Sequence, residues 1–203
     1  MIVNPFNPPP EGSDDPHQGI DFAELYGAQR IAVSGMQVNA VLPGRVAAVV
    51  SDRFPYGNAI LIETRLETLA EEALDILPTG APTPQRKAAL TCPEGIPEPA
   101  WDARHRSLYL LYAHMQQPPT LKIGEQVSCG QKIGTIGSSG NALNPHLHLE
   151  ARLGPAGAEF ASMAHYDTRA TGEEMHNYCL WRISGHFQLT DPLTILASSL
   201  TDQ

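Results

Sequence analysis

Two histidines stand one residue apart in the segment Pro145-His146-Leu147-His148-Leu149-Glu150. Successive side chains of a β-strand alternate between the faces of a sheet, so a strand here would present His146 and His148 on the same side. Leu147 and Leu149 would then point the other way, into a core. Paired imidazoles on one face of a strand could supply half of a metal site or of a proton-transfer site.

Two other segments carry residues of the same chemical type. His17 and Asp21 lie four residues apart near the N-terminus, and His114 follows the apolar run 108–113. Each group stands beside a strand-like segment, which scattered surface histidines would not do. We therefore expect these segments to meet the histidine pair in one site.

The residue types fit a catalytic zinc site, in which three protein ligands leave a fourth position for water. His17, Asp21 and one histidine of the pair at 146 and 148 would supply these ligands. Zinc lowers the pKa of bound water toward about 7, which makes hydroxide available at neutral pH. His114 and the other histidine of the pair could take a proton from the water and stabilise or protonate a tetrahedral intermediate. A structural zinc site would instead close with four ligands, usually rich in cysteine.

Glu150 shares the face of His146 and His148 on an unbroken strand, so its carboxylate could orient one imidazole from behind. The other interpretation, an exposed charge at a strand end, is the one that we expect. Four further histidines have no partner at useful spacing and are interpreted as loop residues: His105, His165, His176 and His186. Two of them, His165 and His176, lie in the second insertion and could reach a groove.

Composition limits the class of protein. A length of 203 residues fits one domain with its own core, and 18 prolines and 17 glycines favour a turn-rich β protein. The formal charge of −9 argues against a nucleic-acid partner, which needs a concentrated lysine and arginine surface. No apolar run approaches the roughly 20 residues of a membrane helix.

Neither the N-terminus nor the cysteines fix the compartment. Residues 1–10 lack the basic and long apolar regions of a signal peptide. Cys92, Cys129 and Cys179 match no zinc or redox spacing. Cys92 and Cys179 fall in segments that we expect to be irregular, where either a disulfide or two free thiols would fit.

Strand signals recur at short spacing between glycines, prolines and asparagines. The spacing of apolar residues predicts a short helix over 66–76, a long loop over 78–101, and tight turns between short strands over 121–137. The predicted strands span residues 30–33, 37–42, 44–50, 58–64, 107–112 and 146–152.

This pattern predicts a mainly β protein, antiparallel and sandwich- or barrel-like, with two long loop insertions at about 66–104 and 154–185. Loops of that length are usually functional, and we expect them to wall a groove. Residues 1–16 would form an extended N-terminal arm, residues 17–197 the domain itself and residues 198–203 a C-terminal tail.

The motifs His17-x-x-x-Asp21, Tyr112-Ala113-His114 and His146-Leu147-His148, in this order, resemble the M23 family of zinc metallopeptidases, the LytM or lysostaphin-type endopeptidases. The resemblance covers roughly residues 17–64 and 107–153. It implies a fold of the duplicated hybrid motif type, with Zn²⁺ held by His17, Asp21 and His148. It also implies that His114 and His146 are the catalytic histidines.

By the same resemblance, the chain would hydrolyse peptide bonds in the stems or cross-bridges of bacterial peptidoglycan. The reaction would take place outside the cytoplasm, in a secreted, periplasmic or cell-surface setting, after export as part of a longer precursor. The expected partner is therefore a peptidoglycan peptide, with no nucleic acid and no membrane insertion. Targeting to the wall would need a further domain or a partner protein.

Three alternatives were weighed against this prediction. A biotinyl or lipoyl carrier would explain the turns over 121–137, but Lys132 lacks the flanking motif and the five His and Asp positions would have no role. A phosphocarrier would use the histidine pair and leave His17 and Asp21 idle. The alternative that remains is a catalytically silent M23-like module, which binds cell-wall peptide or activates a partner hydrolase.

Overall fold

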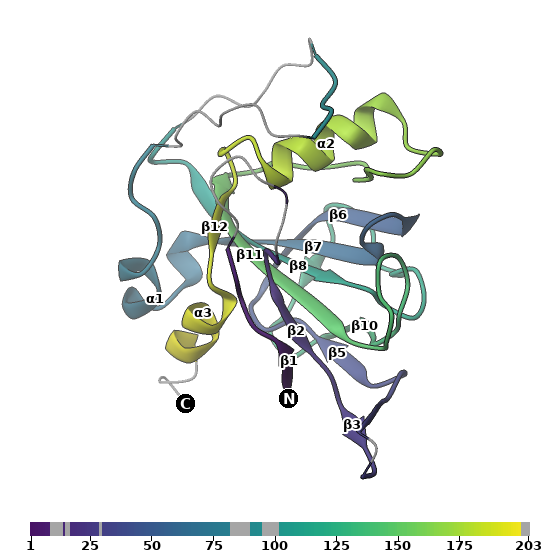
Figure 1. Ribbon diagram of the computed structural model, residues 1–203. Helices are drawn as coiled ribbons and strands as arrows, with labels where there is room; N and C mark the ends of the chain where they lie inside the picture. The colour runs from purple at the N-terminus through teal and green to yellow at the C-terminus, as the bar shows by residue number, and fades with distance from the viewer. Residues whose placement is uncertain (9–13, 15–16, 29, 82–89, 95–101, 200–203) are drawn as a thin grey trace.

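The computed structural model describes residues 1–8, 14, 17–28, 30–81, 90–94 and 102–199. Eight of its strands form one antiparallel sheet: β1 (Ile2–Asn4), β2 (Ile20–Phe22), β6 (Gly44–Arg53), β7 (Gly57–Arg65), β8 (Arg106–Ala113), β9 (Gln126–Val127), β11 (Leu147–Pro155) and β12 (Gln188–Thr190). Their order is β1-β2-β11-β8-β7-β6-β9, with β12 beside β11 (Figure 1). The histidine strand therefore lies between β2 and β8, which come from distant parts of the chain.

The central strands are buried on both faces, which explains their continuous apolar runs. In β8, Leu108 and Leu110 belong to one core, whereas Tyr109 and Leu111 belong to the other. The same alternation turns Leu149 of β11 into the first core, as predicted. His148 consequently faces the second side of the sheet.

Short elements cover the first face of the sheet. β5 (Gln37–Asn39) pairs with β10 (Lys132–Thr135), and Val38 and Ile133 from these strands enter the core. A separate hairpin joins β3 (Leu25–Tyr26) to β4 (Ile31–Ala32). The predicted mainly β, antiparallel fold is confirmed. In the described residues the sheets do not close into a barrel.

The helical elements differ from the prediction. The helix expected over 66–76 is divided into a 3₁₀ turn, η1 (Leu66–Thr68), and a one-turn helix, α1 (Glu71–Asp75). The division occurs because Leu69 and Ala70 both adopt extended backbone, with ψ of 152°. A third helix, α3 (Pro192–Ser199), was not predicted, although the proline at its first position is a start signal.

The second insertion is not merely a loop. It contains α2 (Gly172–Arg182), which lies over the second face of the sheet (Figure 1). Thr171 and Glu174 begin this helix with a capping box, in which each side chain accepts a hydrogen bond from the other residue's backbone N–H. The fully buried Trp181 packs in the second core beside Phe187. The expectation of an irregular segment over 154–185 was therefore wrong for these residues.

A disulfide joins the two insertions. Cys92 and Cys179 are bonded, with their Cα atoms 6.0 Å apart, and Cys129 is free and exposed. Cys179 lies within α2 rather than in an irregular segment. The bond therefore ties α2 to the described stretch 90–94 of the first insertion.

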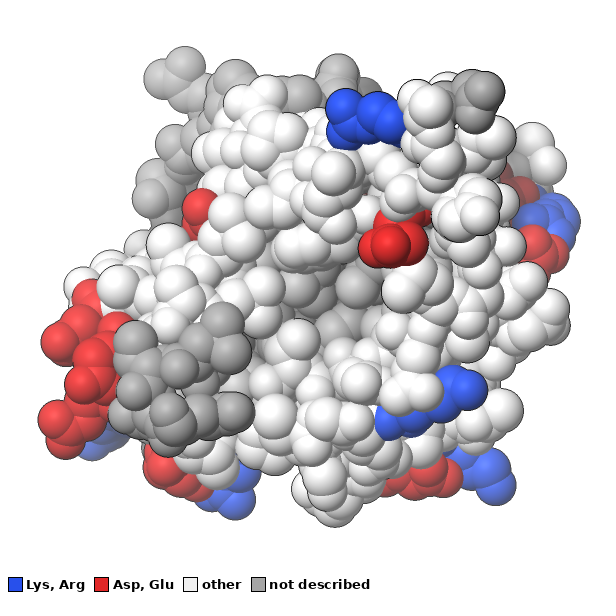
Figure 2. Space-filling view, turned by 90° about the horizontal axis from the view of Figure 1, so that it is seen from below, with Lys and Arg blue, Asp and Glu red and all other residues white. Residues whose placement is uncertain are grey.

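Some predicted segments lie partly outside the described residues, namely 9–13 and 15–16 of the arm, 82–89 and 95–101 of the loop, and 200–203 of the tail. On the face drawn in Figure 2, the described Lys and Arg side chains are scattered and form no continuous basic patch. None of the described helices combines the length and the apolar character that a membrane crossing requires.

The disulfide generates a stability prediction. Replacing both Cys92 and Cys179 by serine should lower the free energy of unfolding by about 2–4 kcal/mol, because the cross-link closes a long loop in the unfolded chain. Chemical denaturation monitored by tryptophan fluorescence measures this change. The exposed Cys129→Ser variant is the control and should unfold like the parent. Equal stability of the double variant and the parent would contradict the prediction.

Candidate metal centre

His17, Asp21 and His148 converge on one point. The register of β2 against β11 sets Asp21 directly opposite His148, and His17 lies four residues before Asp21. Asp21 Oδ1 lies 2.8 Å from His148 Nδ1 and 3.0 Å from His17 Nε2, and the two nitrogens are 3.0 Å apart. The three residues thus form a group that could hold a metal ion.

The outer contacts of this group fix which atoms face inward. The far nitrogen of His17, Nδ1, lies 3.2 Å from the carbonyl oxygen of Pro5, and the far nitrogen of His148, Nε2, lies 3.1 Å from Glu150 Oε1. Because these oxygens only accept, each imidazole keeps its hydrogen on the outer nitrogen. Asn4 Nδ2 donates to the outer oxygen of Asp21 over 3.1 Å.

The inner atoms then present two imidazole nitrogens and one carboxylate oxygen to the same point. Burial opposes ionisation of Asp21, but its contacts with His148 and His17 outweigh that effect and hold the pKa of Asp21 well below its usual range. The donor set of two imidazoles and a carboxylate suits Zn²⁺.

Glu150 corrects an expectation from the sequence. We expected an exposed charge at a strand end, but Glu150 is fully buried behind His148. Burial alone would raise the pKa of this carboxyl, whereas the guanidinium groups of Arg182 and Arg152 lower it well below the usual range. An ionised carboxylate therefore stands behind His148 Nε2, in the arrangement that orients a metal-binding imidazole.

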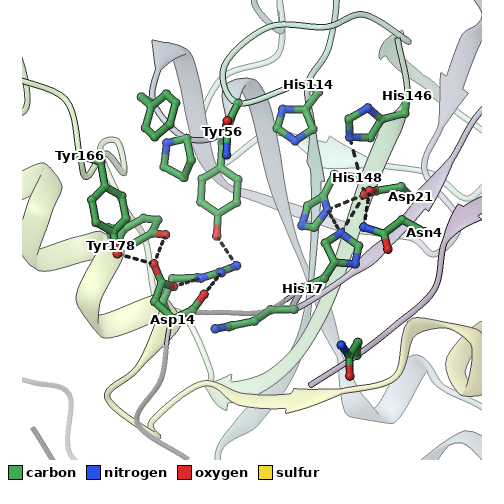
Figure 3. A pocket seen from close by; sticks show the side chains of 16 residues that line it. Asn4, Asp14, His17, Asp21, Tyr56, His114, His146, His148, Tyr166 and Tyr178 are labelled. Carbon is green, nitrogen blue, oxygen red and sulfur yellow. Dashed lines mark hydrogen bonds and ion pairs between the residues drawn. The ribbon is translucent and has the colours of Figure 1, made fainter. Parts of the chain in front are cut away.

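His114 and His146 lie beside this group from the other side (Figure 3). Their ring centroids are 4.8 Å apart, and His146 Nε2 is 3.7 Å from Asp21 Oδ1. His114 Nδ1 donates to the carbonyl of Ser139 over 2.8 Å, and His146 Nδ1 donates to the carbonyl of Asn144 over 2.7 Å. Each imidazole therefore uses Nδ1 to hold the backbone, which leaves Nε2 for proton transfer.

The backbone holds His114 in place. Its φ of +64° lies in the left-handed region, which is unfavourable for a residue with a side chain. The backbone N–H of His114 donates to Tyr56, and its carbonyl accepts from Gly137. Burial, together with the neighbouring His148 and His146, lowers the pKa of His114 to about 3, so this imidazole is neutral at neutral pH.

All five predicted residues line one pocket with a volume of about 740 Å³. Neither His165 nor His176 is among the residues that line it. The pocket is also lined by residues that the sequence did not single out, among them Arg182 and the labelled Asp14, Tyr56, Tyr166 and Tyr178 (Figure 3). No sequence motif predicts these additional residues, since they come from the arm, the turn before β7 and the second insertion.

Gly19 makes the close approach of β2 and β11 possible. A Cβ at this position would lie 2.5 Å from the backbone oxygen of Leu149 and 2.7 Å from the His148 ring. We expect Gly19→Ala to displace His148 and weaken zinc binding at least tenfold, as measured by competition with a chromophoric chelator. Gly80→Ala is the matched control, because no atom lies within 4 Å of its added Cβ. Unchanged affinity in Gly19→Ala would contradict the expectation.

Comparison with known proteins adds evidence independent of this geometry. Residues 102–162 match the model of peptidase family M23, a range that includes His114, His146 and His148. A stretch of 48 residues is 46% identical to the peptidoglycan DD-endopeptidase ShyC of Vibrio cholerae. This match spans 23% of the present chain and only 11% of the length of ShyC.

Solved structures share the fold. The catalytic domain of the antimicrobial peptidase lysostaphin from Staphylococcus simulans aligns with a TM-score of 0.50 at 17% identity, over 98% of this chain and 92% of that domain. The longer lysostaphin structure gives the same TM-score at 16% identity, over 100% of this chain and 51% of that one. The match to the family model and the shared fold confirm the resemblance of this chain to the M23 peptidases.

Proposed function

We propose that this chain is a zinc-dependent endopeptidase that hydrolyses peptide bonds in the stems or cross-bridges of bacterial peptidoglycan. The observation that carries the proposal is the presence of two histidine pairs in one pocket. His17 and His148 turn one ring nitrogen each toward Asp21, and His114 and His146 hold the backbone through Nδ1 beside them. The 46% identity over 48 residues with a peptidoglycan endopeptidase supports the substrate class.

His17, Asp21 and His148 would hold the zinc ion. The chemistry that zinc supplies when bound is Lewis acidity, which lowers the pKa of water and polarises a peptide carbonyl. The hydrogen bonds from His17 to Pro5, from His148 to Glu150 and from Asn4 to Asp21 would keep the three ligands oriented.

His114 and His146 would handle the protons. The neutral His114 can accept a proton at Nε2 from the attacking water, since its Nδ1 hydrogen is held by Ser139. His146, tethered in the same way to Asn144, would stabilise the developing oxyanion by donating from Nε2 when that nitrogen carries a proton. Between them, the two imidazoles can return the proton to the leaving nitrogen.

We infer that the reaction takes place outside the cytoplasm, in a chain exported as part of a longer precursor. The Cys92–Cys179 disulfide supports this setting, because disulfides persist in oxidising compartments. Residues around the pocket that belong to the second insertion, such as Tyr166 and Tyr178, would contribute to the choice of peptide.

Metal content is the first test. Protein purified without added metal should contain about one zinc ion per chain by mass spectrometry, and it should release peptides from purified peptidoglycan. A chelator should abolish the release, and the masses of the products identify the bond. Zinc retention without any cleavage of walls with different cross-bridges would instead favour the catalytically silent module.

Mutants should distinguish the histidines proposed to bind zinc from those proposed to transfer protons. His148→Ala removes a ligand, so both zinc retention and hydrolysis should be lost. His114→Ala removes only a proton acceptor, so zinc should remain while kcat falls about 10²–10⁴-fold. Metal analysis and peptidoglycan digestion on the same preparations measure both effects. Full activity in both variants would show that these roles are wrongly assigned.

A further inference from the structure

Arg182, the last residue of α2, reaches the same pocket as the proposed metal ligands. Only 10% of its side chain is exposed. Its guanidinium group donates from NH1 to Glu150 over 2.6 Å and from Nε to Asp14 over 2.6 Å. Its remaining terminal nitrogen, NH2, donates to the backbone oxygen of Asp14 over 3.0 Å. One buried cation therefore joins two carboxylates from distant parts of the chain.

The first carboxylate stands directly behind His148. Glu150 Oε1 receives Arg182 NH1 and lies 3.1 Å from His148 Nε2, so both groups share one oxygen atom. The other oxygen, Oε2, accepts from Trp181 Nε1 and from Arg152. The position of Glu150, and with it the direction of the His148 ring, thus depends on the end of α2.

The second carboxylate precedes the other histidine ligand. Asp14 lies three residues before His17 in the sequence. Its Oδ2 accepts from Tyr166 Oη over 2.9 Å and from Tyr178 Oη over 2.8 Å, while Oδ1 accepts from Arg182 (Figure 3). Asp14 is therefore held against the second insertion, with its carboxylate on the guanidinium group of Arg182.

We propose that Arg182 is a positioning residue of the metal centre, which orients His148 through Glu150 and is itself held in place by Asp14. The inference rests on the proposed metal site, but it does not depend on which bond is cleaved. Groups that orient metal ligands from outside typically change metal affinity by 10–100-fold when they are removed. The second insertion would then orient a metal ligand as well as form part of the wall of the pocket.

A purely structural role for Arg182, as an anchor of α2, is the competing explanation, and the chain offers a matched control. Arg53 on β6 also binds α2, with Nε 2.7 Å from Glu174 Oε1. Among its hydrogen bonds, neither Glu150 nor Asp14 is a partner. Loss of Arg53 should therefore weaken the attachment of the helix without changing the orientation of the ligands.

The test compares Arg182→Gln, Arg182→Lys and Arg53→Gln in the oxidised protein. Zinc affinity is measured by competition with a chromophoric chelator, and the visible spectrum of the cobalt-loaded protein reports ligand geometry. We expect Arg182→Gln to weaken zinc binding 10–100-fold and to alter the cobalt spectrum. Arg182→Lys keeps the charge but not both contacts and should be intermediate, whereas Arg53→Gln should bind zinc within twofold of the parent.

Asp14→Asn keeps the test decisive if Arg182→Gln does not fold. It removes one charge without altering the buried sheet, and zinc affinity should fall severalfold while the melting temperature stays close to that of the parent. Parental zinc affinity and cobalt spectra in Arg182→Gln, or in Asp14→Asn where the first variant does not fold, would overturn the inference.

The outcome also separates this inference from the proposed activity. If the parent binds zinc and hydrolyses nothing while Arg182→Gln binds zinc more weakly, the activity is wrong and the positioning role stands. If the parent is active and Arg182→Gln binds zinc equally well, only the positioning role is wrong. If the parent does not bind zinc, both are overturned.

Discussion

The convergence of three potential metal ligands on one point is the constraint on which the rest of this structure depends. His17 Nε2, Asp21 Oδ1 and His148 Nδ1 lie within 3.0 Å of one another. Each of these side chains has other rotamers that point elsewhere, so the fold has to hold them from outside. β2 and β11 fix two of the backbones by pairing, and hydrogen bonds to the outer atoms fix the rings and the carboxylate.

The side chains that orient the ligands from outside include buried charged groups. Glu150 and Arg152 follow His148 on the same face of β11, where a simpler sheet would carry apolar residues. Burying a lone carboxylate costs several kcal/mol, whereas a carboxylate that receives guanidinium and indole donors can remain ionised. α2 provides two of these donors, Arg182 and Trp181, and at the same time covers the second core. Electrostatics and packing therefore require the same helix in the same position.

Motif spacing and strand alternation were enough to predict much of this arrangement. The alternation within Leu147-His148-Leu149 predicted which side of β11 faces the core, and the order of the His and Asp motifs predicted which residues share the pocket. The burial of Glu150 could not be predicted, because its partner Arg182 lies 32 residues away in a segment with no apolar period. Asp14 and Arg182 are 168 residues apart, and only the folded chain brings them together. The helix itself does carry a local sequence signal, the Thr171-x-x-Glu174 capping box.

The location of α2 affects how active and inactive proteins of this kind can be distinguished from their sequence motifs. The family model matches residues 102–162, so Arg182, Asp14 and the Cys92–Cys179 bond all lie outside the matched range. A related chain could therefore keep every histidine of the motif and still bind metal poorly if its insertion lacked an equivalent cation. Conversely, transplanting only the matched segment into another scaffold would carry over His148, Glu150 and Arg152 without Arg182, the second guanidinium group on the carboxylate. An intact motif is then a necessary sign of a working centre, but not a sufficient one.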